Sequence, residues 1–335
     1  SYLVVFPFIA VAPRLLVIIP ILFLFGAGNG SLDVSMNAQG SEAERASGRS
    51  IMTSLHGFFS VGALLGAGAG ALAAHFGLPP LAHFLIVALL GIATLARTRA
   101  WLIPGEPKPH AEASPIFVLP AKALLPLGAL ACCASIGEGA MGDWSGLYLH
   151  DHLGTAKGYA ALGYAAFSVA MVLGRFFGDR AVERIGPARM VRTGGLIAAV
   201  GLGIATVIND PPAMLFGFAA IGLGLSAVYP LVFSAAGNHP SLPSGQAVAG
   251  VATIGYTGFL AGPPVLGWIA QFTSLRAIMA AVVILAALAA ALALKRCRSP
   301  LFPKLCRLVR EKCPSSGAAP AKRRPRRAPF PRAFR

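Results

Sequence analysis

An aspartate lies inside an apolar segment that is long enough to cross a membrane. Asp33 follows Asn29 by four residues and precedes Asn37 by four, so in a helix the three polar side chains form one stripe. A charge at the centre of a bilayer costs about 2.5 to 3.5 kcal/mol on insertion scales, so such a residue normally faces a cavity or a partner. Burial favours the neutral carboxyl, which suits a group that takes up and releases protons. A structural hydrogen bond to a neighbouring helix is the alternative.

A second group of polar side chains lies in the glycine-rich stretch GEGAMGDWSG at residues 137–146. The glycines weaken the helix there, and discontinuous membrane helices often line binding sites. Glu138 and Asp143 are therefore candidates for binding a polar ligand, and the ring of Trp144 for stacking on a flat face such as that of a sugar. The simpler alternatives are an Asp143 exposed at a helix end and a Trp144 that anchors the membrane interface.

His56 lies near the start of another apolar segment, which carries three glycines at intervals of four that favour close helix packing. A polar ring beside such a seam suits contact with a ligand or a proton, and a histidine bonded to a neighbouring helix is the alternative. Phe58, Tyr229 and Tyr256 are further candidates for ligand contact, with ordinary packing as the alternative for each.

The composition places these residues in membrane-spanning helices. The chain has 335 residues, 56% of them hydrophobic and only 12% charged, with a mean hydropathy of +0.70. A soluble domain has about 25% charged residues. The apolar runs have the length of about 20 residues that crosses a hydrocarbon core as a helix. We therefore predict an all-α membrane protein with nine full helices and one partial helix, at residues 1–11, 14–37, 51–74, 80–101, 123–148, 158–178, 188–208, 212–235, 246–271 and 276–294.

Lysine and arginine set the orientation, because cytoplasmic loops carry the excess of both. In the loops and the adjoining helix ends before residue 295, 11 of these residues lie on one side and 3 on the other, so the basic side and the C-terminus are expected in the cytoplasm. The net charge of +16 does not indicate nucleic-acid binding, since 14 of the 28 Lys and Arg lie in residues 295–335. The composition of that segment predicts a disordered tail suited to anionic lipid headgroups.

Signatures of an enzyme are missing from the sequence. Of the five cysteines, two fall in an apolar segment and three in the basic tail, so they form no disulfide framework. We find no metal-binding histidine cluster, no Walker loop and no GxSxG motif. The sequence therefore predicts neither an enzyme nor a bound cofactor.

The chain contains an internal repeat. Residues 26–34 (GAGNGSLDV) resemble residues 222–230 (GLGLSAVYP), at an offset of 196. The predicted helix that starts near Lys122 has no partner at that offset, so we expect a first half that lacks two helices and part of a third. The expected organisation is an incomplete N-terminal half (1–101), a central cytoplasmic loop (102–122), a six-helix C-terminal half (123–294) and a basic tail (295–335).

Five segments of the chain, taken together in order and spacing, resemble the major facilitator superfamily, and within it the bacterial inner-membrane subgroup related to the fucose permease. These are GNGSLDVSMNAQG (28–40), HGFFSVGALLGAG (56–68), GEGAMGDW (137–144), LGRFFGDR (173–180) and GYTGFLAGPPVLG (255–267). The resemblance implies a two-half helical bundle with about ten of twelve transmembrane helices present, located in the inner membrane as a monomer.

The resemblance also implies a function. It suggests a secondary active transporter that moves a small polar solute, such as a sugar, by alternating access coupled to protons. Asp33 matches a position at which the fucose permease carries a protonatable glutamate, so it is the expected proton-coupling residue. The expected substrate-binding residues are Asn29, Asn37, His56, Phe58, Glu138, Asp143, Trp144, Tyr229 and Tyr256. A proton-driven efflux antiporter and an inactive truncated transporter remain open as alternatives.

Arg175, Asp179, Arg180 and Glu183 form a charge cluster at the cytoplasmic end of a predicted helix, where we expect pairing with Arg189 or with the next helix end. In the family that the chain resembles, such clusters act as a gate latch. Ordinary positive-inside topology is the alternative, and it explains the arginines better than the two acids.

Overall fold

The computed structural model describes residues 2–103 and 121–294, and within these two stretches every regular element is helical. The elements are α1 (Tyr2–Val5), a 3-10 segment (Phe6–Val11), α2 (Leu15–Ser47), α3 (Met52–His75), α4 (Pro80–Thr98), 3-10 turns at Arg99–Trp101 and Lys122–Leu124, α5 (Leu125–Leu147), a π-helical turn (Tyr148–His152), α6 (Lys157–Ile185), α7 (Pro187–Ile208), α8 (Pro211–Leu225), α9 (Val228–Gly237), α10 (Ser244–Phe272) and α11 (Leu275–Leu294).

The helical segments agree with the spans predicted from hydropathy. In the described ranges, nine are long and apolar enough to cross a membrane, and each coincides with one of the nine predicted full spans. The shorter apolar stretch Tyr2–Val11 coincides with the predicted partial span. The prediction of an all-α membrane protein is therefore confirmed.

The structure differs from the prediction at some helix ends. α2 continues to Ser47, well beyond the predicted end at residue 37, because hydropathy marks only the apolar part and the Glu, Ala and Arg residues that follow favour helix. The predicted span 212–235 is divided into α8 and α9. Pro230 accounts for the interruption, since it has no N–H to donate to the carbonyl of Ser226.

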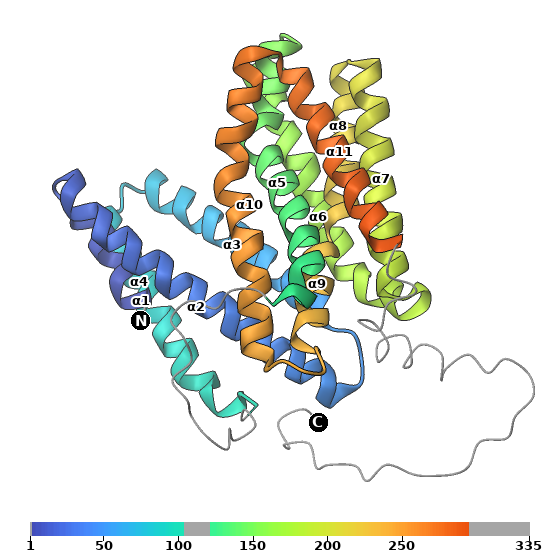
Figure 1. Cartoon of the computed structure of the whole chain (residues 1–335). Helices are drawn as coiled ribbons and strands as arrows, with labels where there is room; N and C mark the ends of the chain where they lie inside the picture. Colours follow the sequence, from blue (N-terminus) through green and yellow to red (C-terminus); the bar gives the residue numbers. More distant parts are fainter. Residues whose placement is uncertain (1, 104–120, 295–335) are drawn as a thin grey trace, which may run out of the picture.

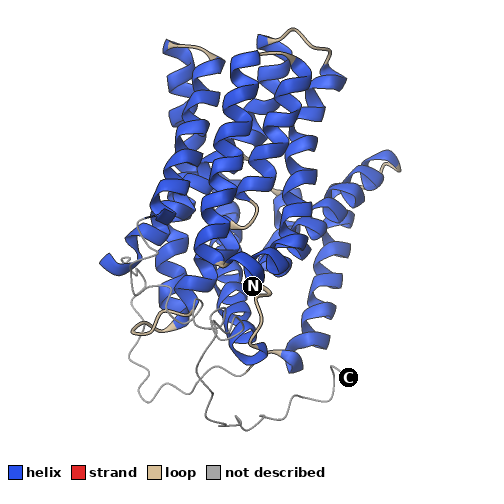
Figure 2. Ribbon diagram, turned by 90° about the vertical axis from the view of Figure 1, so that its right-hand side faces the viewer, coloured by secondary structure: helices blue, strands red, loops and turns tan. Residues whose placement is uncertain are grey.

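The helices form two groups (Figure 1). The C-terminal bundle, α5 to α11, stands as a set of helices packed side by side, and the N-terminal helices, α1 to α4, lie to one side and are inclined to it. The groups meet where α2 packs on α9 and α10 and where α3 packs on α6 and α9. Figure 2 shows the molecule from a second direction, in which helices joined by loops make up the described chain.

Glycines bring helices of the C-terminal bundle into backbone contact. A Cβ on Gly222 of α8 would collide with the carbonyl oxygen of Phe167 in α6, and a Cβ on Gly194 of α7 would collide with that of Gly224. Small residues commonly let membrane helices approach in this way. The N-terminal helices instead leave many large apolar side chains exposed, as suits contact with lipid.

Two predicted segments fall outside the described residues. The basic tail lies there entirely, and the central loop expected at 102–122 lies there for the most part. The division of the chain into an N-terminal and a C-terminal half therefore stays a prediction.

Candidate functional site

Asp33 belongs to a hydrogen-bonded chain of four side chains, which we call the Asp33 network. Asn37, one turn further along α2, places Nδ2 at 2.9 Å from the carbonyl oxygen of Asp33 and at 3.2 Å from its Oδ1. Asn37 Oδ1 lies 2.9 Å from Nε2 of His56 in α3. From the C-terminal bundle, the hydroxyl of Tyr256 in α10 donates to Asp33 Oδ2. The network thus links three helices and both helix groups.

The Asp33 network has a buried end and an open end. Asn37 is 1% exposed and His56 is 8% exposed, and the His56 ring stacks on Phe233 at a centroid distance of 6.1 Å. Tyr256 is 41% exposed. The buried side chains of Asn37 and His56 hold the carboxyl of Asp33 in position. The partly exposed Tyr256 leaves the opposite side of that carboxyl accessible. This arrangement suits a carboxyl that exchanges a proton with its surroundings.

A second polar group, which we call the Arg175 cluster, joins α5, α6 and α3. The Nη2 atom of Arg175 lies 3.3 Å and 3.5 Å from the two carboxylate oxygens of Glu138. Its Nη1 atom donates to Ser60 Oγ at 2.6 Å, and Ser60 in turn donates to the carbonyl oxygen of His56 at 3.1 Å. The Arg175 cluster and the Asp33 network therefore meet at His56.

Tyr229 lies close to both groups without bonding to either. Its hydroxyl is hydrogen-bonded to Ser135 Oγ of α5, and Ser135 also donates to the carbonyl oxygen of Gly255 at 2.7 Å. Its ring packs near Phe233 at a centroid distance of 5.4 Å. Tyr229 thus ties α9 to α5 and α10 beside the residue that precedes Tyr256.

Three predicted site residues are not brought into these groups. Asn29, Phe58 and Asp143 are exposed, and no hydrogen bond to the side chain of any of them is found among the described residues. Phe58 makes an edge-to-face contact with Phe176, at 5.5 Å between ring centroids. Their proposed contacts with substrate therefore rest on the sequence alone.

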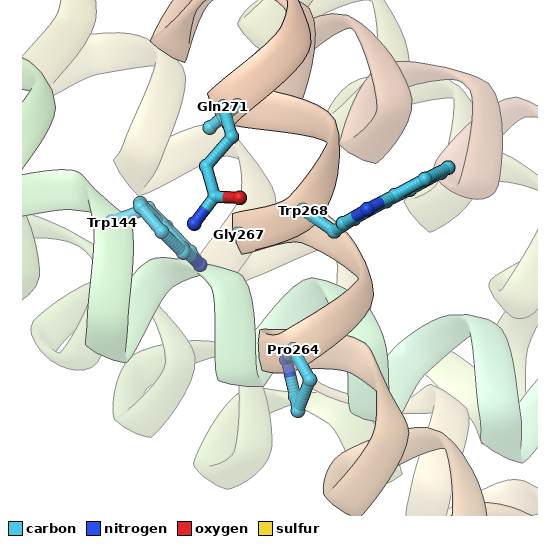
Figure 3. Close-up of a pocket in the computed structure, with 6 residues that line it drawn as sticks. Trp144, Pro264, Gly267, Trp268 and Gln271 are labelled. Carbon is cyan, nitrogen blue, oxygen red and sulfur yellow. The ribbon is translucent and has the colours of Figure 1, made fainter.

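Trp144 lies in a separate place, between the ends of α5 and α10. It lines a cavity of about 540 Å³ together with Pro264, Gly267, Trp268, Ala270 and Gln271. Figure 3 shows the side chains of Trp144 and Gln271 lying close to each other while Trp268 points away. A Cβ on Gly267 would touch the Trp144 ring at 3.4 Å, so the glycine lets the indole lie against α10.

Asp179 forms a contact between the two helix groups that the sequence did not indicate. Its Oδ1 accepts from the backbone N–H of Thr53 at 3.0 Å, and its Oδ2 accepts from that of Ser54 at 2.8 Å. These amides belong to the first turn of α3, where unpaired N–H groups and the helix dipole favour an anion. The expected pairing with Arg189 is therefore wrong for Asp179, because its carboxylate accepts hydrogen bonds from the N-terminus of α3 instead. Arg180 is exposed and lies in no ion pair of the described chain.

Glu44 and Arg45 strengthen the same junction. Glu44 Oε1 accepts from the backbone N–H groups of Ile51 and Met52, both at 3.0 Å, and Ser234 of α9 donates to its other oxygen. Arg45 reaches across to Asn238 Oδ1 at 2.8 Å and also donates to the carbonyl oxygen of Gly237. We call Glu44, Arg45 and Asp179 with their partners the α3 junction.

Reasoning from the sequence missed Glu44, Ser60 and Ser135. Ser60 lies four residues after His56 and so shares its helix face, a signal that was available. Glu44 is an acid that follows the apolar span, and its bonds to the next helix depend on the sharp turn at Gly48, which has φ of +63°. Nothing in the local pattern around Ser135 indicates a bond to Tyr229.

Removing the Asp179 carboxylate is expected to loosen the α3 junction. In Asp179→Ala, the N–H groups of Thr53 and Ser54 lose charged acceptors worth about 1.5 to 3 kcal/mol each. Hydrogen–deuterium exchange of the peptide at 51–56 should become at least about tenfold faster. Glu183→Ala removes an exposed acid from the same helix and should leave this rate unchanged. Equal rates in both variants would show that Asp179 does not hold α3.

Comparison with known proteins identifies the family. The family model described as Major Facilitator Superfamily matches residues 1–240 and 127–304. An uncharacterized MFS-type transporter of Yersinia pestis is 41% identical over 254 residues, which cover 76% of this chain and 66% of that protein. An uncharacterized transporter of Sinorhizobium fredii is 37% identical over 297 residues, which cover 87% of this chain and 78% of that protein. Membrane protein MosC of Rhizobium meliloti is 33% identical over 270 residues, or 79% of this chain and 64% of that protein.

Solved structures share the fold. The major facilitator transporter FucP in its outward conformation matches with a TM-score of 0.68 at 17% identity, over 88% of this chain and 80% of that one. A bacterial homologue of the iron transporter ferroportin in an outward-facing state matches with a TM-score of 0.65 at 14% identity, over 88% and 81% of the two chains. The chain spans about two thirds of the length of the Yersinia and Rhizobium relatives. With nine apolar helices in the described ranges and a family match over most of its length, this chain belongs to the major facilitator superfamily.

Proposed function

We propose that the protein is a secondary active transporter that carries a small polar solute across the inner membrane together with protons. The observation that carries this proposal is the carboxyl of Asp33, which lies in an apolar helix and accepts a hydrogen bond from Tyr256 of the opposite helix group. A titratable group at such a contact can link its protonation to the relative position of the two groups. The names of the relatives support transport, and one structure with the same fold is that of the E. coli fucose:proton symporter.

In the proposed mechanism, protonation of Asp33 removes the negative charge that strengthens the hydrogen bond from Tyr256. The tie between α2 and α10 then weakens, while the α3 junction keeps the cytoplasmic end closed. Binding of the solute beside the Arg175 cluster, followed by release of the α3 junction, lets the two groups rock about the site and open it to the cytoplasm. Loss of the proton from Asp33 to the cytoplasm restores the tie.

The remaining features of the proposal follow from charge and size. The excess of Lys and Arg on one side supports a cytoplasmic C-terminus. We propose a monomer, in which one chain contains both helix groups and the site between them. Asn37, His56, Glu138, Tyr229 and Tyr256 are the proposed contacts near the solute.

The test is solute uptake by the purified protein in proteoliposomes with an inwardly directed proton gradient. Candidate solutes are sugars, sugar acids and small metabolites, tested one at a time with and without a protonophore. We expect at least one solute to accumulate only while the gradient lasts, and to carry protons inward when added alone. Accumulation that is indifferent to the protonophore, or a solute that drives protons in the opposite direction, would contradict the proposal.

A further inference from the structure

Arg175 has hydrogen-bonding capacity that the described structure does not use. It is 7% exposed, and its Nε atom has no partner among the described residues. A guanidinium carries five N–H donors and cannot lose its charge inside a protein. The donors of Arg175 that are used are those of Nη1, bonded to Ser60, and of Nη2, bonded to Glu138. A buried donor without a partner is costly, so an unused N–H next to an ion pair calls for an explanation.

The bond between Arg175 and Glu138 is loose. Both carboxylate oxygens of Glu138 face the same nitrogen, Nη2, at 3.3 Å and 3.5 Å. Charge-assisted hydrogen bonds are normally about 2.7 to 2.9 Å long, and a carboxylate binds a guanidinium best through two parallel N–H bonds. The Nε–H and one Nη2–H point in the same direction and make such a fork. Glu138 contacts only one arm of it.

The two members of the ion pair are not equally buried. The side chain of Glu138 is 22% exposed, whereas that of Arg175 is 9% exposed. The half-buried acid is thus the more accessible partner of the buried base. Nη1 of Arg175 is bonded to Ser60 of α3, which belongs to the N-terminal helices. Arg175 thus already bridges the two helix groups, and a ligand bound to it would contact this bridge.

Resting on the function proposed above, we propose that the transported solute carries a carboxylate, and that this carboxylate binds the Nε and Nη2 edge of Arg175 in place of Glu138. The negative charge of the solute takes over the pairing, so the buried guanidinium is never left without a counter-ion during the exchange. Glu138 swings away from Arg175 while the solute is bound. A second negative charge on the solute would find no further basic side chain in the cluster, which favours a monocarboxylate over a phosphate.

The test is isothermal titration of the purified protein in detergent micelles with matched pairs of probes: gluconate and glucose, lactate and lactamide, benzoate and benzamide. We expect one or more carboxylates to bind while their neutral counterparts do not. In Arg175→Lys, which keeps the charge and loses the fork, the affinity for that carboxylate should fall by about tenfold or more. Arg184→Lys changes an exposed arginine of the same helix and should leave the affinity as it is.

Glu138→Gln is expected to change the carboxylate affinity in the opposite direction, and it keeps the test usable if Arg175→Lys does not fold. Removing the competing charge should tighten carboxylate binding by about tenfold. A purely structural ion pair predicts weaker binding in both variants, so unchanged or weaker binding in Glu138→Gln would overturn the inference. So would the failure of every carboxylate to bind better than its neutral counterpart. Titration requires neither a proton gradient nor transport, so its outcome is independent of the uptake test. Proton-driven uptake of a neutral sugar would refute this inference alone. Carboxylate binding without proton-coupled uptake would refute the proposed function alone.

Discussion

Asp33→Asn is expected to abolish proton-driven accumulation of solute while leaving exchange of solute across the membrane intact. An amide has nearly the same shape as a carboxyl, and it can still meet the hydroxyl of Tyr256 and the side chain of Asn37. It cannot take up or release a proton in the physiological range. The measurement compares accumulation under a proton gradient with exchange of internal for external solute in the same proteoliposomes. Accumulation should fall to background, and exchange should remain.

Asp151→Asn is the matched control, because it makes the same change at an exposed acid on the π-helical turn. It should accumulate solute like the unaltered protein. If Asp33→Asn still accumulates solute against a gradient, Asp33 is a structural hydrogen-bonding residue and the proton is carried elsewhere. If exchange is lost together with accumulation, Asp33 acts in solute binding or folding rather than in coupling.

Gly222→Val is expected to prevent folding of the C-terminal bundle. The new side chain would have to occupy the position of the Phe167 carbonyl oxygen, which belongs to the backbone of α6 and cannot rotate away. α8 would have to move away from α6, and overpacking of this kind typically costs 1 to 3 kcal/mol and occasionally more. We expect a loss of monodisperse protein on size-exclusion chromatography in detergent, or a greatly lowered melting temperature.

Gly203→Ala is the matched control in the neighbouring helix α7. A Cβ there would meet Val283 at 3.7 Å, an ordinary contact distance. Alanine is also the better helix former by about 1 kcal/mol. This variant should therefore melt at the same temperature or higher. A Gly222→Val protein that melts like the Gly203→Ala protein would show that α6 and α8 do not pack as closely as described here.

The membrane-spanning architecture could be predicted because it depends on local composition. A run of about 20 apolar residues has few other stable states, since unpaired backbone groups are too costly in lipid. The same reasoning fails at helix ends, where polar helix formers extend α2 and where Pro230 interrupts a continuous apolar run. Hydropathy indicates whether a segment lies in lipid or in water, whereas capping residues and proline determine where its helix ends.

The candidate site could be predicted only in part. The stripe of Asp33 and Asn37 follows from helical spacing, and the structure places both in one hydrogen-bonded network. The sequence predicts that Asp143 and Trp144 bind ligand together with Glu138, because the three lie in one glycine-rich stretch. Helical rotation instead leaves Asp143 exposed, turns Trp144 toward α10 and turns Glu138 toward α6.

The sequence by itself determined that this chain is a bundle of membrane helices with an acid in an apolar span, because both facts depend on residue types and on spacings of a few residues. Only the tertiary structure decided which partners those residues have. Tyr256 meets Asp33 across 223 positions of the chain, Ser60 meets Arg175 across 115, and Thr53 meets Asp179 across 126. No periodicity in the sequence predicts such long-range pairings, because they depend on the crossing angles and the rotation of whole helices against each other.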